Sequence, residues 1–314
     1  MKPRILIAEI SGKRPGDVKA RPTEKFETQH DCIIISNNSE GYITEWPILN
    51  VPDDYREWYK SKIKNSENMW YAQMNRSYAI KYAKENGYDY LVQLDDNITM
   101  LEIAYRVEIG NIVKSYKVSS NKMMDDFIEM FISVLENTNA VMAGCNMCSM
   151  MPVDNFLSER YVYSCFCIKL SDCPDVFQGD FEDDIEYRLK CMQMGLPVLQ
   201  IVPFRYGKTA QKSKNDKTGC REEYARAGCL RGDHMLKLYS DYYSCGMTNR
   251  SKGTNCRVDE FATTFRHSLK PFRLGTIVYD YDAILECFNR IIEKYPDNRN
   301  SQSKIRVKRM RVTK

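Results

Sequence analysis

The sequence has no apolar run that approaches the roughly 20 residues needed to span a bilayer. It also lacks the apolar region of a secretory signal, because the stretch from Ile5 to Ala8 that follows Arg4 is far too short. No internal repeat is visible. Together these absences predict a cytoplasmic protein with no membrane partner.

The twelve cysteines lack the arrangement of a disulfide framework or a zinc site. They are scattered along a long chain without a signal segment, which favours reduced thiols that act as small core residues. A zinc site could be suspected at Cys145-x-x-Cys148 and Cys165-x-Cys167. The second pair lacks the usual two-residue gap, and its neighbours are typical strand residues.

The chain has no large excess of charge of either sign, because the formal net charge is only +4. With 28% charged and 43% hydrophobic residues, the chain is typical of a globular protein. The last eleven residues contain no acid and six cations, which are Lys304, Arg306, Lys308, Arg309, Arg311 and Lys314. Such a tail favours an acidic partner such as DNA, RNA or a membrane surface, or else is a solvated segment that aids solubility.

Hydrophobic periodicity predicts alternating strands and helices. In the helix predicted over 69–86, Trp70, Met74, Tyr78 and Tyr82 recur at helical spacing, and Gly87 suits the left-handed residue after a helix end. The predicted strands cover 5–10, 32–35, 88–94, 140–144, 161–170 and 196–202, and the further helices cover 123–136, 183–195 and 282–294.

Strand, helix and strand joined by short connections predict a parallel sheet with right-handed crossovers. The expected fold class is therefore α/β, Rossmann-like, with a mainly parallel sheet flanked by helices. In such sheets ligands bind beyond the carboxyl ends of the strands. Asp95-Asp96-Asn97 follows the strand predicted over 88–94, so it lies where a ligand is expected.

Paired oxygen ligands at Asp95-Asp96-Asn97 suit a hard divalent ion, Mn²⁺ or Mg²⁺, that takes the rest of its shell from water and a diphosphate. Such an ion neutralises the charge that builds on a departing nucleoside diphosphate. Acids at strand ends also cap helices and terminate sheets, so the motif alone leaves both interpretations open.

A second acidic group precedes the helix predicted over 183–195. It comprises Asp180, Glu182, Asp183 and Asp184. The helix macrodipole accounts for some acids here, but not for four within five residues. Mutual repulsion raises the pKa of at least one of them, which suits a general base for an acceptor hydroxyl. A solvated acidic cap is the alternative.

The stretch from 74 to 80 and the stretch from 87 to 97 together resemble the helix-then-DXD-strand pattern of GT-A glycosyltransferases. The resemblance implies that Asp95, Asp96 and Arg76 bind a nucleoside diphosphate sugar and that Asp96 and Asn97 hold the metal. It also implies that the loop with Ser11, Lys13 and Arg14 holds the nucleotide. The chain departs from the pattern at Asn97, where many members have a third acid, and at Asn75-Arg76, where the family often has Arg-Asn.

Residues 182–189, followed by Gly195-Leu196-Pro197-Val198, are similar to the acid pair, helix and strand of inverting members. This similarity implies that Asp183 is the catalytic base, with Glu182 or Asp184 as the alternative. Many members supply a third metal ligand from a C-terminal histidine. His234 is the better candidate and His267 the second, whereas His30 receives no role.

The resemblance covers 1–205, the expected nucleotide-sugar and catalytic core. Residues 206–300 are expected to form an acceptor-side loop and extension of the same domain, with helical and loop structure, and 301–314 the basic tail. Within GT-A enzymes the chain looks most like the TET/JBP-associated group of phages and bacteria, related to the base J glucosyltransferase. That likeness implies transfer of a hexose from UDP-glucose or a relative to a hydroxymethylated pyrimidine in DNA, in the host cytoplasm if the protein is phage-encoded.

For a DNA acceptor, phosphate contacts are expected from Lys208, Lys212, Lys214, Lys217 and Arg309. The target base would have to be flipped out of the duplex, and aromatic residues between 239 and 243 could stack on it. Three other hypotheses remain. One is a glycosyltransferase that acts on protein or polysaccharide. Another is a nucleotidyltransferase, but residues 11–16 match the Gly-rich loop of that class only in part. The third is a non-catalytic DNA-binding module.

Overall fold

The computed structural model describes most of the chain. The described residues are 2–63, 71–159, 162–177, 183–209, 236–241, 243–249, 263–269, 280–295 and 304–308.

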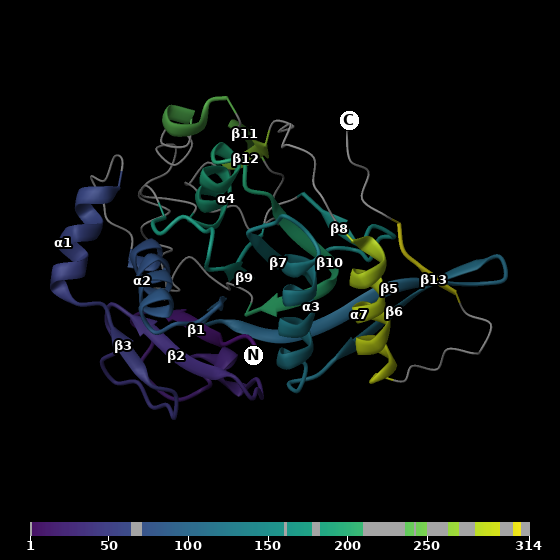
Figure 1. The fold of residues 1–314 in the computed structure, drawn as a ribbon, viewed down its shortest axis with the longest axis horizontal. Helices are drawn as coiled ribbons and strands as arrows, with labels where there is room; N and C mark the ends of the chain where they lie inside the picture. The colour runs from purple at the N-terminus through teal and green to yellow at the C-terminus, as the bar shows by residue number, and fades with distance from the viewer. Residues whose placement is uncertain are drawn as a thin grey trace.

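These residues form helices and strands that alternate through the first two thirds of the chain (Figure 1). The helices are η1 (Pro22–Lys25), α1 (Asp53–Lys62), α2 (Tyr71–Glu85), α3 (Met124–Glu136), α4 (Asp183–Gln193) and α7 (Tyr281–Glu293). The strands are β1 (Ile5–Ser11), β2 (Asp31–Ser36), β3 (Ile48–Asn50), β4 (Tyr90–Asp95), β5 (Ile98–Ile109), β6 (Ile112–Ser119), β7 (Met142–Met147), β8 (Leu157–Ser158), β9 (Cys165–Lys169), β10 (Val198–Lys208), β11 (Tyr243–Asn249), β12 (Thr263–Leu269) and β13 (Lys304–Arg306).

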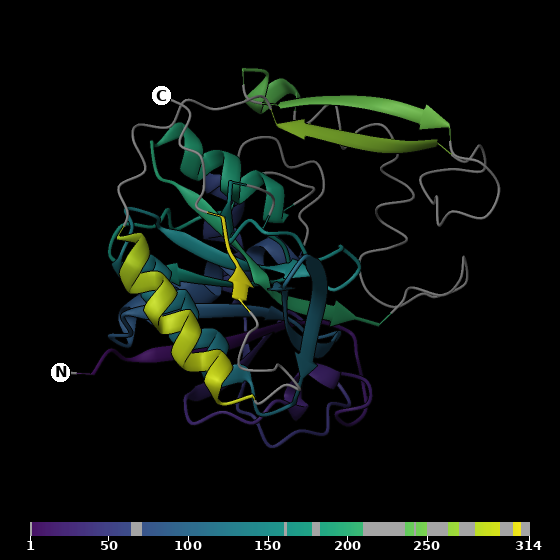
Figure 2. The same ribbon diagram turned by 90° about the vertical axis from the view of Figure 1, so that its right-hand side faces the viewer.

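One large sheet has the order β13-β5-β10-β7-β9-β4-β1-β2-β3, with β6 paired to β5 and β8 to β10. The predicted parallel pairing is confirmed for β1 with β2 and β4. The sheet as a whole is mixed, because β9 runs antiparallel between β4 and β7, and β5 runs antiparallel to β10. The prediction of an α/β fold is confirmed. A separate two-stranded sheet joins β11 and β12, apart from the large one (Figure 2).

Helices cover both faces of the large sheet. α3 and α7 pack side by side on one face, where their apolar residues form a cluster with β4, β5 and β10 (Figure 1). α1, α2 and α4 contribute to a second cluster on the other face. Within the described part of the chain, no helix has the length and apolar character of a membrane span.

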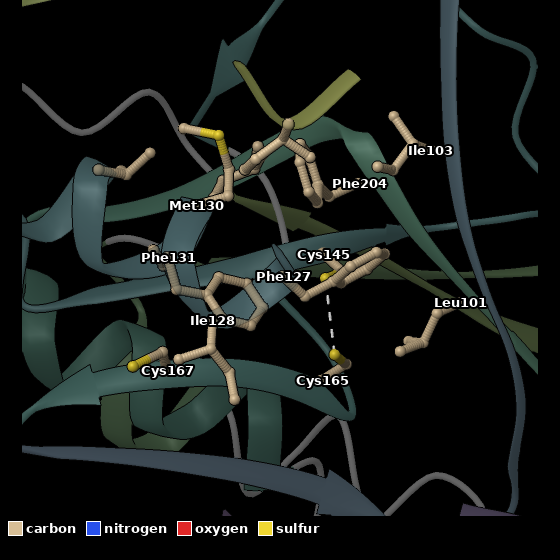
Figure 3. Close-up of a cluster of buried hydrophobic side chains, with 14 of the residues drawn as sticks. Leu101, Ile103, Phe127, Ile128, Met130, Phe131, Cys145, Cys165, Cys167 and Phe204 are labelled. Carbon is tan, nitrogen blue, oxygen red and sulfur yellow. Dashed lines mark hydrogen bonds between the residues drawn. The ribbon is translucent and has the colours of Figure 1, made fainter. Parts of the chain in front are cut away.

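Buried cysteines belong to these clusters. Cys145 and Cys165 point toward each other beside Phe127, with 3.5 Å between their sulfur atoms (Figure 3). The eight cysteines whose side chains the structure describes are free thiols, as the sequence predicts. Burial raises the pKa of Cys145 well above its ordinary value, which keeps this thiol protonated and unreactive.

The β5–β6 hairpin was not predicted. It starts at Ile98, directly after the acidic motif, and turns at Gly110-Asn111, where Gly110 has a φ of 59° that glycine adopts without strain. Gly-Asn between two alternating segments is a recognised hairpin signal. β13 pairs with the other edge of β5, so Lys304 to Arg306, expected in the basic tail, form part of the sheet.

Candidate active site

Asp95 is positioned by the alternation of side chains along β4. Tyr90, Val92 and Leu94 face the cluster under α3, so Gln93 and Asp95 face α2. Arg76 on α2 bridges the two, donating to Gln93 Oε1 at 3.2 Å and to Asp95 Oδ1 at 2.5 Å. Arg76 is almost completely buried, so its contact with Asp95 is an internal ion pair.

Asp95 has a second cationic partner. The ammonium group of Lys208, at the end of β10, donates to Asp95 Oδ2. Burial by itself raises the pKa of Asp95, but the charges of Lys208 and Arg76 more than offset it and hold the pKa well below its ordinary value. Asp95 is therefore ionised throughout the physiological range. The sequence analysis predicted that Lys208 contacts the acceptor DNA. In the structure its ammonium group instead lies against Asp95, in the predicted donor site.

Asp96 contacts the loop that follows β1. Its Oδ2 atom accepts a hydrogen bond from Ser11 Oγ at 2.8 Å and lies 2.6 Å from Arg14 Nε. Burial raises the pKa of Asp96 to about 6, against the opposing influence of Arg14 and Ser11. The sequence prediction that Ser11, Arg14 and Asp96 share one site with Asp95 and Arg76 is consistent with these contacts. Lys13 lies in the same loop, with a φ of 57°.

Tyr42 and Arg21 extend this site, and the sequence analysis did not single them out. The hydroxyl group of Tyr42 is 2.8 Å from Ser11 Oγ and accepts from the Arg14 backbone at 3.3 Å. Arg21 lies over the Tyr42 ring, 4.0 Å from its centroid, and donates to the carbonyl groups of Arg14 and Ile43. A fully buried guanidinium therefore fixes the two segments that flank Asp96.

A buried carboxylate cluster supports Arg21 from beneath. Arg21 Nε donates to Glu24 and lies 3.8 Å from Glu9 Oε1. Burial, followed by the nearby charges of Asp96 and Glu24, raises the pKa of Glu9 well above its ordinary value. Glu9 is fully buried on β1, and its raised pKa favours the neutral carboxyl group, which costs less free energy to bury than a carboxylate.

Asn75, Gly12 and Asn37 lie together at the carboxyl ends of β1 and β2. Asn75 Nδ2 donates to the Ser11 carbonyl group at 3.1 Å and to Asn37 Oδ1 at 3.4 Å. A Cβ atom at Gly12 would lie only 2.6 Å from Asn37 Oδ1. A larger residue at position 12 would therefore displace the end of the Asn37 side chain. Asn75 was quoted in the sequence motif, but nothing in the sequence revealed its contact with β1.

The turn that carries Asp96 and Asn97 is fixed by Thr23. Its hydroxyl group donates to the Asp95 carbonyl group at 2.6 Å and accepts from the Ile98 backbone at 3.0 Å. The Asn97 carbonyl group accepts from the Thr209 backbone at 3.1 Å. Both sides of the turn are tied down, so the acidic motif is rigid before any ligand binds.

The residues of this turn fit a divalent cation in part. Asn97 Oδ1 is buried and has no hydrogen-bond donor among the described residues, and the hydrogen bond and ion pair of Asp96 both involve Oδ2. Carboxylate and amide oxygens are the hard ligands that Mn²⁺ and Mg²⁺ accept. Across the described ranges, however, no three His, Cys, Asp or Glu residues gather into a metal site. Two protein oxygens suit an ion whose remaining ligands come from water and a diphosphate.

The second acidic group is described only in part. Asp183 and Asp184 begin α4, but their side chains lie outside the description. Phe177 is held by α1 and α2, because its carbonyl group accepts from the Tyr59 hydroxyl group at 3.1 Å and its backbone N–H donates to Ser77 Oγ at 2.9 Å. Further predicted site residues that lie outside the described residues are Glu182, His234, Lys212, Lys214, Lys217 and Arg309. His267 lies in β12, paired with Cys245 of β11.

The fold and the site define an α/β protein with a rigid acidic turn at the carboxyl end of a parallel strand, flanked by arginine and lysine. Residues 21–217 match the family described as TET-Associated Glycosyltransferase. This match covers more than half of the chain, and the protein belongs to that family. It is a glycosyltransferase, as the sequence analysis predicted.

Solved structures with a similar arrangement are distant in sequence. A protein described as a nucleotide-diphospho-sugar transferase from Desulfovibrio desulfuricans is 14% identical, with 76% of this chain and 98% of that one covered and a TM-score of 0.36. Glucosyl-3-phosphoglycerate synthase from Mycobacterium tuberculosis, solved with Mn²⁺, UDP and phosphoglyceric acid, is 8% identical, with 90% and 92% covered and a TM-score of 0.44. No curated protein matches the chain.

Proposed function

We propose that the protein transfers a hexose from a nucleoside diphosphate sugar to the hydroxyl group of a hydroxymethylated pyrimidine in DNA, with inversion at the anomeric carbon. The observation that carries the proposal is the pairing of Asp95 and Asp96 with separate cations, Lys208 and Arg14, at one strand end. Such a site offers both the acids and the cations that a diphosphate and its counter-ion need. The family's association with TET oxygenases favours an acceptor that carries an oxidised methyl group.

Donor binding would use the carboxyl ends of β1, β2 and β4. Ser11, Arg14 and Tyr42 lie on one side, and Arg76 orients Asp95 on the other. We infer that the ammonium of Lys208 and the guanidinium of Arg14 turn from the carboxylates toward the diphosphate when the donor enters. Charge-assisted hydrogen bonds of this kind contribute about 1.5–3 kcal/mol each. The cations would then stabilise the leaving group.

Asp96 and Asn97 would hold the divalent ion, Mn²⁺ or Mg²⁺, with a third ligand from His234 in the sequence-based assignment. When bound, the ion supplies positive charge to the leaving diphosphate. The chain's own part is to keep Asp96 and Asn97 in one rigid turn, through Thr23 on one side and Thr209 on the other. This pre-organisation lowers the entropic cost of binding.

Asp183 is the proposed base, with Glu182 or Asp184 as the alternative. It would take the proton of the acceptor hydroxyl group as that oxygen attacks the anomeric carbon from the face opposite the diphosphate. The assignment is supported by the hydrogen bond from the Phe177 backbone to Ser77, next to Arg76 in α2, because Phe177 precedes this acidic group in the chain. General base catalysis of this kind contributes about 10²–10⁴-fold in rate.

The deciding experiment combines a donor screen with an acceptor screen. UDP-, GDP- and CDP-sugars are tested with and without Mn²⁺ for a rise in melting temperature, which a bound donor produces. The best donor is then offered with hydroxymethylated duplex DNA, with unmodified DNA and with a protein or polysaccharide acceptor. Sugar transfer to the hydroxymethylated duplex alone supports the proposal. Transfer only to protein or polysaccharide contradicts the proposal that DNA is the acceptor. If no acceptor receives sugar, the result favours a non-catalytic DNA-binding module.

A further inference from the structure

A basic face lies on the arm formed by β5, β6 and β13. The registers Arg106↔Ser115 and Arg306↔Arg106 fix which side chains share a side of these strands. Tyr105, Val107 and Ile305 pack toward α3 and α7, so the alternate residues point to the opposite side. The cations on that side, which we call the basic face, are Arg106, Lys117, Lys304, Arg306 and Lys308.

The basic face is only partly neutralised by acids. Asp154 is buried beneath it and binds Arg306 at 2.9 Å and Arg106 at 3.1 Å, with Lys308 at 3.7 Å. Glu108 pairs with Arg306 at 3.1 Å. Five cations against these two acids leave a net charge of +3 on this face, out of +4 for the whole chain.

One further acid on the same side does not change this balance. Glu102, near the base of the arm, lies 3.3 Å from Arg205 of β10, and the two neutralise each other inside the sheet. Among the cations of this face, Lys117 and Lys304 are exposed, and 66% of the Lys308 side-chain surface is accessible to solvent. These lysines present their charge to solvent.

The arm is connected directly to the acidic turn. β5 begins at Ile98, the residue after Asn97, and runs to Ile109 without interruption. In Figure 1 the β5–β6 hairpin extends past α3 and α7, with β13 against it. At about 3.3 Å per residue, the positions paired with Lys117 and Lys304 lie roughly 20 and 33 Å along the strand from Ile98. The longer of these two distances is about one turn of B-form DNA, roughly 34 Å.

We propose that the basic face binds the phosphate backbone of duplex DNA and holds it along β5, so that a base flipped out of the duplex reaches the acidic turn. The inference rests on the proposed function and names the surface that the acceptor uses. A row of cations on a narrow arm, which reaches about one helical turn away from the acidic turn, suits the charged backbone of a duplex. It gives affinity without reading sequence, which suits an enzyme that selects its target by the modified base.

The test measures how binding depends on salt. A fluorescein-labelled hydroxymethylated duplex is titrated with the wild-type protein and with Lys117→Gln/Lys304→Gln at several KCl concentrations, by fluorescence anisotropy. Each lost phosphate contact reduces the slope of log K against log[KCl] by about 0.9, so the double variant should lose nearly two units. Lys60→Gln/Lys81→Gln removes the same charge from α1 and α2 and should keep the wild-type slope.

The outcomes separate the two proposals. If the double variant binds duplex with the wild-type salt slope, the proposed role of the basic face is wrong, but the proposal of a DNA acceptor is unaffected. If the wild-type protein transfers sugar to a free hydroxymethylated nucleoside but does not bind duplex at low salt, both the DNA acceptor and the basic face fail. If the double variant transfers sugar to duplex more slowly than wild type, but to the free nucleoside at the same rate, the proposed role of the basic face is supported.

Discussion

The ammonium group of Lys208 and the carboxylate of Asp95 meet across 113 residues of sequence. Lys208 ends β10, which runs parallel to β7 and antiparallel to β5, and Asp95 ends β4 in the parallel half of the sheet formed by β4, β1, β2 and β3. Their ion pair therefore joins β10 to this half at the proposed donor site. Because Arg76 remains on the other carboxylate oxygen, Asp95 keeps a counter-charge when Lys208 turns away. Lys208 is thus the cation that can leave Asp95 for a diphosphate.

Replacing Lys208 by Gln should weaken donor binding about tenfold, or about 1.4 kcal/mol, since one charged contact to the diphosphate is lost. Isothermal titration with the best nucleoside diphosphate measures this effect. Lys81→Gln, on the exposed side of α2, is the matched control and should bind like wild type. Equal affinity in the Lys208 variant would mean that this lysine serves Asp95 alone.

Asp96→Asn should abolish the extra thermal stabilisation that Mn²⁺ gives to the nucleotide complex. An amide oxygen can still accept from Ser11, so the fold should survive, but the carboxylate charge that attracts the ion is gone. The measurement is the melting temperature with nucleotide, with and without Mn²⁺. Glu40→Gln, an exposed acid in the loop before β3, should keep the full manganese effect. An intact effect in the Asp96 variant would place the ion elsewhere.

Gly144→Ala should destabilise the protein by about 1–3 kcal/mol, because overpacking forces a backbone shift. The new Cβ atom would lie 2.1 Å from Val162 Cγ1 and 3.0 Å from the Cys165 carbonyl oxygen, which is backbone. Gly12→Ala meets only the end of the Asn37 side chain and should cost less stability, while weakening donor binding through the displaced Asn37. Urea unfolding of both variants gives the comparison, and an equal or reversed order would contradict it.

The strands and helices of the parallel half could be predicted because each has a strong local pattern. β1, β2 and β4 are apolar runs that end in polar turns, and α2 shows helical spacing. The hairpin was missed because β5 starts right after the acidic motif, although Gly110-Asn111 marks its turn. β13 could not have been found from a basic segment of three residues, because it is a strand only through pairing with β5. At the site, the acids were evident from sequence, whereas their partnerships with Lys208 and Tyr42 depend on tertiary packing.

Asp154 should contribute stability that depends on pH. A hydrogen bond from Arg306, followed by the nearby charges of Arg106 and Lys308, holds the pKa of Asp154 below its ordinary value. A group whose pKa falls on folding stabilises the protein fully above its unfolded pKa, about 3.9, and loses this contribution as the pH falls through its folded pKa. Asp154→Asn should therefore be less stable than wild type at pH 7, and the difference should shrink toward pH 3.

Urea unfolding at both pH values measures the difference, with Glu40→Gln as a control that should match wild type at either. Equal stability of Asp154→Asn and wild type at pH 7 would contradict the proposed anchoring of β13.

Asp183→Asn should separate catalysis from donor binding. The amide keeps the shape of the side chain and its place at the start of α4, but it cannot accept a proton, so transfer should fall by about 10²–10⁴-fold. Donor affinity should stay within a factor of about two, or about 0.4 kcal/mol, since the proposed diphosphate contacts are those of Arg14 and Lys208. The matched variants Glu182→Gln and Asp184→Asn remove the same charge one residue away on either side. If one of them loses transfer while Asp183→Asn keeps it, that residue is the base instead. If all three retain transfer, the hydroxyl proton is taken by a group outside this segment, and the inverting mechanism built on it fails.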